Sequence, residues 1–280
     1  MQDHKTNLLQ NIEKIEKDGI LNKEAIGLYS DIFDFQSKTH EEWKEMVPFP
    51  ELKTDAKMPF EPSSLKLDNA ARDLLKKSFK SLCSVIHTHN QGMDLSSTVN
   101  TLESDDSFID TVIDHLLKKN TDALFAMAET ARIGFEEYLY LVVNWLKPLF
   151  VALMERYAGN VLDEYHDRTC PFCGYYPDMG ILSAEKEGRR YLRCGLCENV
   201  WMYRRLSCAI CGERDAKKLE YFMLENDERY RVDACNSCKG YIKSVCLGKF
   251  DEMDGCDLTV ENLITMSIDA EMMDKGYGKL

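Results

Sequence analysis

The sequence of 280 residues is poor in several features that mark other classes of protein. It has only 7 prolines and 15 glycines, while 44% of its residues are hydrophobic, so a low-complexity or generally disordered chain is excluded. It also has no Gly-rich phosphate loop, no Gly-x-Ser-x-Gly elbow and no His-Glu-x-x-His motif. We therefore expect a folded globular protein that is not an enzyme.

Positive charge is in short supply. The chain carries 35 Lys and Arg against 48 Asp and Glu, a net charge of −13. Residues 1–169 hold 19 basic and 29 acidic side chains, whereas residues 170–280 hold 16 and 19, so most of the acidity belongs to the first part. Phosphate contacts need clustered Lys and Arg, so we expect no nucleic-acid partner.

Long hydrophobic runs are missing as well. The most apolar stretch, residues 138–154, is interrupted by Asn144, Lys147 and Pro148 and is shorter than the roughly 20 residues that a membrane-spanning helix needs. The first residues are polar and acidic, without the apolar core of a signal peptide. We expect no membrane insertion and a cytoplasmic protein.

Apolar residues before the first cysteine pair recur with the period of a helix. The clearest examples are residues 8–15, 74–86, 106–119 and 135–157. The last of these predicts a central buried helix, kinked or entered near Pro148, and a Pro-containing stretch at 48–62 predicts an extended connector. No strand-like alternation is evident here, so we predict an all-helical domain over residues 1–166.

The pattern changes in the second part of the chain. Short strands are predicted at residues 189–193, 199–205, 221–224 and 229–232, the last two as a hairpin around residues 225–227. Residues 258–273 return to helical spacing and predict a closing C-terminal helix.

Eight of the eleven cysteines form four Cys-x-x-Cys pairs, and all of them lie in this second part. Two such pairs separated by roughly 15–20 residues are a strong sign of a metal site, and the chain carries that arrangement twice. Gly174 and Gly212 follow the first and third pairs and can supply the positive φ of a metal-binding turn.

The spacing predicts two sequential modules, each holding one ion. The first, residues 167–206, contains Cys170, Cys173, Cys194 and Cys197. The second, residues 207–280, contains Cys208, Cys211, Cys235 and Cys238 and includes the closing helix. The fold class is therefore multidomain: an all-α N-terminal domain followed by two tandem rubredoxin-like or zinc-ribbon modules and a C-terminal helix.

Four thiolates close a tetrahedral site and leave no position for water or substrate, so structural zinc is the simplest occupant. Iron fits the same donors. A thiol–disulfide role is a weaker interpretation, because the pairs occur in tandem without a thioredoxin-like context. Cys83, Cys246 and Cys256 lie outside the pairs and are predicted to be structural.

Basic and aromatic side chains flank the first module. They are Arg189, Arg190, Arg193, Trp201, Arg204 and Arg205. Local balance of the negative charge that four thiolates leave on a divalent ion is the simpler interpretation of these arginines. A docking patch for an acidic partner is the functional interpretation, and the six residues are candidates for partner binding.

Residues 189–212, RRYLRCGLCENVWMYRRLSCAICG, resemble the formate dehydrogenase accessory protein family, FdhE. The resemblance extends to CPFCGYYPDMGIL at 170–182, to CNSCKGYIK at 235–243 and to the ending DLTVENLITMSIDAEMMDKGYGK. It therefore covers the chain from the first cysteine pair onward, whereas the helical part matches only in general character.

The resemblance implies a helical domain followed by two rubredoxin-like modules that bind iron through the paired cysteines. It also implies a partner, the catalytic subunit of a molybdenum or tungsten formate dehydrogenase, whose biogenesis the family assists. Two alternatives stay open from the residues alone: a rubredoxin-like electron-transfer protein and, less favoured, a zinc-ribbon nucleic-acid-binding protein. The oligomeric state is not indicated.

Overall fold

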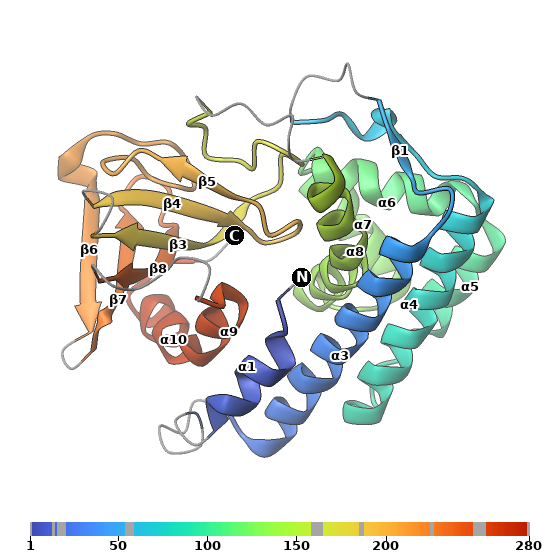
Figure 1. Ribbon diagram of the computed structural model, residues 1–280. Helices are drawn as coiled ribbons and strands as arrows, with labels where there is room; N and C mark the ends of the chain where they lie inside the picture. The colour runs from blue at the N-terminus through green and yellow to red at the C-terminus, as the bar shows by residue number, and fades with distance from the viewer. Residues whose placement is uncertain are drawn as a thin grey trace.

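The structure is a computed structural model that describes residues 2–12, 15, 21–53, 59–157, 165–184, 188–224, 227–248 and 256–278. Two lobes lie side by side (Figure 1). We call residues up to 157 the helical lobe, and residues from 165 onward, with their sheet and two closing helices, the β lobe. The predicted order of a helical part, a cysteine-rich β part and C-terminal helices is confirmed.

The helical lobe contains seven helices among the described residues. They are α1 (His4–Gln10), α3 (Lys23–Glu45), α4 (Asn69–His89), α5 (Ser96–Ser104), α6 (Ser107–Leu117), α7 (Thr121–Ala131) and α8 (Phe135–Tyr157). Side-chain caps fix where the long helices begin. Asn22 accepts a hydrogen bond from the Ala25 N–H, and Asp68 accepts one from the Ala71 N–H, both at 2.8 Å.

The central helix of this lobe is α8, as its apolar pattern predicts. The Trp145 indole donates to the Leu75 carbonyl on α4 at 2.9 Å and meets Phe79 edge to face. Pro148 lies inside the helix without ending it. Among the described residues, α8 alone has the length and apolarity to cross a membrane, but 67% of its most apolar window is buried inside the protein. It is the core helix of the fold.

The predicted connector over residues 48–62 contains a small β structure. Strands β1 (Glu51–Leu52) and β2 (Leu65–Lys66) pair antiparallel, and a 3-10 turn (Pro62–Ser64) precedes β2. Residues 54–58 lie outside the described part of the chain. The sequence gives no sign of this pair, because two-residue strands are too short to show alternation.

The β lobe is built on one six-stranded sheet in the order β5-β4-β3-β8-β7-β6. Its strands are β3 (Pro177–Ser183), β4 (Arg189–Cys194), β5 (Val200–Tyr203), β6 (Leu219–Leu224), β7 (Asp227–Cys235) and β8 (Tyr241–Leu247). The four predicted strands correspond to β4, β5, β6 and β7. Residues 225 and 226, in the predicted hairpin turn, lie outside the described residues.

The two central strands, β3 and β8, join the halves of this sheet. They run parallel, with Gly180 opposite Ser244 and Ser183 opposite Leu247, whereas the other neighbouring strands are antiparallel. A Cβ on Gly180 would lie 2.5 Å from the Ser244 hydroxyl, so a larger residue here would force the Ser244 side chain to move. The strands of both predicted modules therefore form a single sheet.

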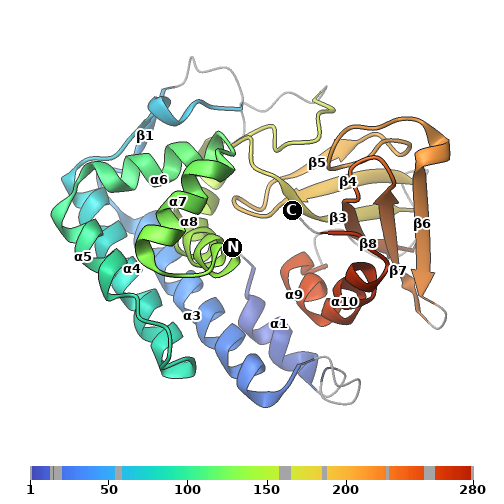
Figure 2. The same cartoon turned by 180° about the vertical axis from the view of Figure 1, so that it is seen from behind.

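Two short helices cover one face of the sheet (Figure 2). They are α9 (Leu258–Ile264) and α10 (Met266–Asp274), which divide the predicted closing helix at Thr265. Leu258, Ile268 and Met272 pack against sheet residues such as Ile181 and Val245. On its other side, α9 contacts the first helix of the chain, α1. The C-terminal helices thus touch both lobes.

Candidate metal centres

Each of the four cysteine pairs forms the same turn. In the first pair, the Gly174 N–H donates to the Cys170 carbonyl at 2.9 Å, and the Cys170 N–H donates to the Tyr175 carbonyl at 2.9 Å. Equivalent pairs of bonds begin at Cys194, Cys208 and Cys235. The turn directs backbone N–H groups at the sulfur atoms, as in Phe172 N to Cys170 Sγ at 3.4 Å.

The residue after the second cysteine of each pair has a positive φ. Gly174 and Gly212 have φ of 74° and 80°, while Glu198 and Lys239 have φ of 60° and 58°. The difference in sequence between the pairs with and without glycine is therefore not a difference in backbone conformation. For an L residue this conformation costs about 1 kcal/mol or more, so the Glu198 and Lys239 side chains occupy unfavourable backbone positions.

We call the first group of sulfurs, from Cys170, Cys173, Cys194 and Cys197, site 1. These four atoms lie within 4.8 Å of one another. Cys170 Sγ is 3.5 Å from Cys197 Sγ, and Cys173 Sγ is 3.5 Å from Cys194 Sγ. All four side chains are at most 1% exposed. Site 1 is therefore an interior site.

The surroundings of site 1 come from both lobes. The Phe60 N–H donates to the carbonyl of Phe172, which lies between the first two cysteines, at 3.0 Å, and the two rings meet edge to face. Phe60 also stacks on Phe150 of α8. Lys119, just after α6, donates to the Gly174 carbonyl at 2.8 Å. The first metal-binding turn is thus held in place by the helical lobe.

We call the second group, from Cys208, Cys211, Cys235 and Cys238, site 2. Its sulfurs also lie within 4.8 Å of one another, with the closest contacts at 3.8 Å. Cys208 and Cys235 are buried, Cys211 is half-buried and Cys238 is exposed. Only a small apolar cluster, with Ile210 and Leu219, surrounds it. Site 2 therefore lies at the periphery of the β lobe.

The donor atoms at both sites fit a tetrahedral metal ion. A tetrahedron with metal–sulfur bonds of about 2.3 Å has edges of about 3.8 Å, close to the sulfur–sulfur distances here. Burial raises the pKa of Cys173 and Cys197 well above the ordinary value, so site 1 would not hold four thiolates unaided. A divalent cation bound there would supply the missing charge, and zinc and iron both accept this donor set.

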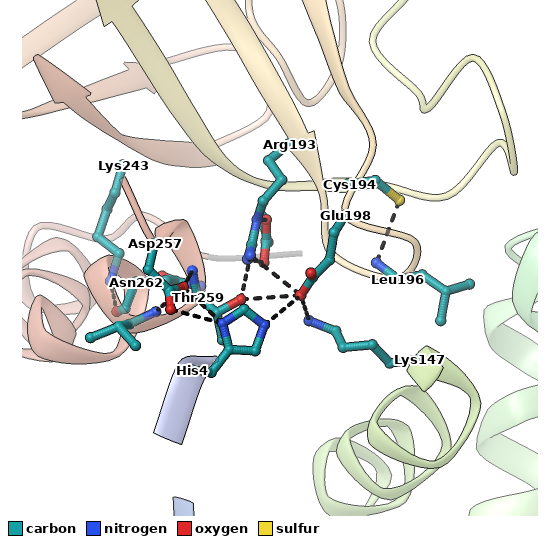
Figure 3. Close-up of polar contacts among 12 residues, drawn as sticks. His4, Lys147, Arg193, Cys194, Leu196, Glu198, Lys243, Asp257, Thr259 and Asn262 are labelled. Carbon is teal, nitrogen blue, oxygen red and sulfur yellow. Dashed lines mark hydrogen bonds and ion pairs between the residues drawn. The ribbon is translucent and has the colours of Figure 1, made fainter. Parts of the chain in front are cut away.

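Glu198, directly after the last cysteine of site 1, is the centre of a buried ionic network (Figure 3). One carboxylate oxygen lies 3.2 Å from His4 Nε2 on α1, 3.2 Å from Lys147 Nζ on α8 and 3.7 Å from Arg193 on β4. Burial would raise the pKa of Glu198, but Lys147, His4 and Arg193 hold it well below its usual range. This network explains the side chain at the positive φ.

The network continues into α9. His4 Nδ1 lies 2.9 Å from Asp257, which caps α9 through the Thr259 and Val260 N–H groups. Arg193 forms an ion pair with Asp178 and a hydrogen bond with Thr259. Figure 3 shows these side chains converging from both lobes. Sequence reasoning missed the network, because its members are scattered from residue 4 to residue 259 and no local pattern links them.

Three of the six candidate partner-binding residues are interior, which corrects that interpretation. Arg190, Arg193 and Trp201 are only 2–5% exposed. Arg190 donates to the Ser207 carbonyl at 3.0 Å, Arg193 belongs to the ionic network, and the Trp201 indole donates to the Asp167 carbonyl at 2.9 Å. Each side chain therefore makes its polar contacts inside the β lobe or where the β lobe meets the helical lobe, and not with a partner protein.

The other three candidate partner-binding residues are exposed. Arg189, Arg204 and Arg205 lie at the surface. A Cβ on Gly188 would be 3.0 Å from the Arg205 guanidinium, so Arg205 lies beside the start of β4, where Arg189 is. These three arginines remain candidates for contact with a partner.

Comparison with known proteins gives one family throughout. A family model described as "FdhE, central domain" matches residues 169–205. A "Protein FdhE homolog" of Aquifex aeolicus is 24% identical over 219 residues, covering 78% of this chain and 72% of that protein. One from Shewanella oneidensis is 34% identical over 110 residues, covering 39% of this chain but only 35% of that protein.

A solved structure extends the likeness to the helical lobe. The crystal structure of the FdhE protein from Pseudomonas aeruginosa aligns with a TM-score of 0.59 and 20% identity, covering 99% of this chain and 92% of that one. At this identity the match shows a shared fold. The resemblance seen in the cysteine-rich sequence is confirmed.

Proposed function

We propose that this chain, which belongs to the FdhE family, is a metal-binding accessory protein of a molybdenum or tungsten formate dehydrogenase. It binds the catalytic subunit of that enzyme and is needed for its assembly or activity. The observation that carries the proposal is the pair of four-cysteine clusters, set in a fold shared with P. aeruginosa FdhE over nearly the whole chain. The family consists of accessory proteins rather than enzymes, in agreement with the absence of catalytic motifs from the sequence.

Cys170, Cys173, Cys194 and Cys197 hold one ion in this proposal, and Cys208, Cys211, Cys235 and Cys238 hold the other. Iron or zinc fits either site. Four protein thiolates leave no coordination position open, so the ions support the fold and do not bind substrate. At site 1 the ion also stabilises the junction of the lobes, since the Phe172 turn packs on Phe60.

The partner surface includes the exposed arginines Arg189, Arg204 and Arg205. They form a basic corner on a chain whose net charge is −13, which suits an acidic surface of the partner. The protein acts in the cytoplasm, where the partner subunit is made.

Deletion of the gene tests the proposal. Formate dehydrogenase activity falls in the deletion strain and returns with the wild-type gene, and the catalytic subunit co-purifies with the tagged protein. A gene that carries Cys83→Ser serves as the control and should restore the activity as the wild-type gene does, because Cys83 lies on α4, in neither cluster. A deletion strain with full formate dehydrogenase activity would rule the proposal out.

Electron transfer by rubredoxin-type iron is the second candidate function. The exposed Cys238 favours it, because a sulfur ligand at the surface gives electrons a short path to a partner. Elemental analysis of protein prepared without oxygen separates the two. Iron with a visible spectrum that a reductant bleaches reversibly supports electron transfer, and zinc alone removes it.

A further inference from the structure

A cleft of about 360 Å³ lies where the helical lobe meets the β lobe. Tyr29 and Tyr140 line it from α3 and α8, while Tyr175 and Tyr176, directly after the first metal-binding turn, line it from the β lobe. Met266 of α10 also lines it. Clefts of this size at the junction of two domains are common binding sites, and nothing in the metal chemistry uses this one.

Two tyrosine hydroxyls at the cleft have no hydrogen-bond partner among the residues that the structure describes. Neither the Tyr140 nor the Tyr175 hydroxyl makes a hydrogen bond with any residue that the structure describes; Tyr140 is 38% exposed and Tyr175 is half-buried. A phenol is neutral at neutral pH and its hydroxyl can donate one hydrogen bond. A ligand that offers acceptor groups to both lobes would satisfy them.

The charged side chains beside the cleft are paired with one another, so an uncharged ligand fits it better than an ionic one. Lys147 and Arg193 line the cleft, but Glu198 and Asp178 already neutralise them. His4 and Asp257 add one basic and one acidic group. No surplus of positive charge therefore attracts an anion. The Lys147 ammonium uses one of its three protons on Glu198 among the described contacts, so donors to a neutral acceptor remain.

We propose that this cleft binds an extended, uncharged peptide segment of the partner polypeptide. An aliphatic or aromatic side chain of the segment lies against the tyrosine rings and Met266, and its backbone carbonyls accept hydrogen bonds from the Tyr140 and Tyr175 hydroxyls. An extended peptide offers carbonyls at short intervals, which suits donors on opposite walls. The identity of the partner rests on the proposed function above, whereas the class of ligand rests on the cleft.

Short overlapping peptides that cover the formate dehydrogenase catalytic subunit are the probe, with binding measured by fluorescence anisotropy. Met266→Trp fills the cleft, while Met273→Trp places the same side chain on the same helix at an exposed position that does not line the cleft. We expect uncharged peptides with an apolar residue to bind the wild type and Met273→Trp alike. Met266→Trp should weaken them at least about tenfold, the equivalent of about 1.4 kcal/mol.

Hydroxyl deletions give a gentler test that does not threaten folding. Tyr140→Phe and Tyr175→Phe should each weaken peptide binding by about 2- to 10-fold, the value of one hydrogen bond. Tyr221→Phe removes a hydroxyl from an exposed tyrosine on β6, outside the cleft, and should change nothing.

The proposal is overturned if no peptide binds the wild type, or if Met266→Trp binds peptides as well as Met273→Trp does. A dimer of this chain that Met266→Trp dissociates would also overturn it, since a second copy would then fill the cleft. Capture of the full-length subunit decides the proposed function separately. Capture of the subunit without peptide binding supports the proposed function and overturns the proposal for the cleft. Peptide binding without capture supports the proposal for the cleft and overturns the proposed function.

Discussion

Sites 1 and 2 use the same ligands and the same turns in opposite surroundings. Site 1 is enclosed on all sides, packs on Phe60 and the helical lobe, and is followed by Glu198, which ties α1, α8 and β4 together. Site 2 has an exposed cysteine, a small apolar cluster and, in the position equivalent to Glu198, the exposed Lys239. A metal-binding turn thus takes its structural role from its neighbours.

The largest difference between the sites should appear when a ligand is removed. Cys173→Ser and Cys211→Ser change the second cysteine of the first pair in each module, and each variant should lose one ion. Because binding of a structural metal contributes on the order of 10 kcal/mol to folding, Cys173→Ser should lower the melting temperature of the helical signal strongly. Cys211→Ser should leave most of that signal intact.

Circular dichroism at the helical band, with metal content measured in parallel, checks this prediction. Equal melting temperatures for the two variants, with one ion lost from each, would show that site 1 has no special link to the helical lobe. Cys83→Ser is again the control for loss of a thiol.

The same substitution after each site should change the stability by very different amounts. Glu198→Gly leaves the buried Lys147 ammonium without its counter-charge, which costs about 3–5 kcal/mol, while Arg193 keeps its ion pair with Asp178. Lys239→Gly relieves a positive φ worth about 1 kcal/mol and loses contacts with Tyr277 and Asn236. Its net effect should stay within about 1 kcal/mol. Urea denaturation measures both, and comparable losses of stability would contradict the comparison.

The two ions should leave at different rates. A chelator reaches the exposed Cys238 at site 2 directly, whereas site 1 must first open to solvent. We expect two phases of metal release, with site 2 faster by roughly tenfold or more. Stopped-flow absorbance with a coloured chelator records both phases, and Cys211→Ser should remove the fast one. Loss of the slow phase in that variant would reverse the assignment.

The smallest expected effect concerns pH and the network beneath site 1. Burial alone would lower the pKa of His4, but hydrogen bonds with Asp257 and Glu198 raise it above the ordinary value of 6.5. Stability from protonated His4 is therefore complete below about pH 6.5 and is lost as the pH rises through the folded-state pKa. The difference in unfolding free energy between wild type and His4→Gln should shrink over that range.

Urea denaturation at a series of pH values gives this difference. His87→Gln provides the control, because His87 is exposed on α4, outside the network. A difference that stays constant or grows with pH would show that His4 is not charged in the folded protein.

Local signals explain what could be predicted from the sequence. The spacing of the cysteines was enough to group them, since each turn is made within five residues and each hairpin joins neighbouring pairs. Periodicity found α4, α6 and α8, because one face of a helix repeats its burial within a few residues. Strands β4, β5, β6 and β7 were visible as short runs beside the cysteines.

Long-range packing explains what was missed. Strands β3 and β8 are buried on both faces, so they lack the alternation of a strand that faces solvent on one side. The arginines of β4 look alike in sequence, yet Arg189 is exposed while Arg190 and Arg193 are buried. Arg190 and Arg193 are buried because they pair with Asp178, Glu198 and Ser207, which come near them only in the folded chain.

The parallel pairing of β3 with β8 also orders events during synthesis. Strand β3 cannot pair with β8, which places Gly180 opposite Ser244, until the ribosome has synthesised both hairpins and β8 has left the ribosome. All four cysteines of site 1 precede that moment, as do those of site 2. A nascent chain therefore has all eight cysteines of the two sites before β3 can pair with β8. Metal binding can come first, and the central strands then join two halves of the sheet that their ions already stabilise.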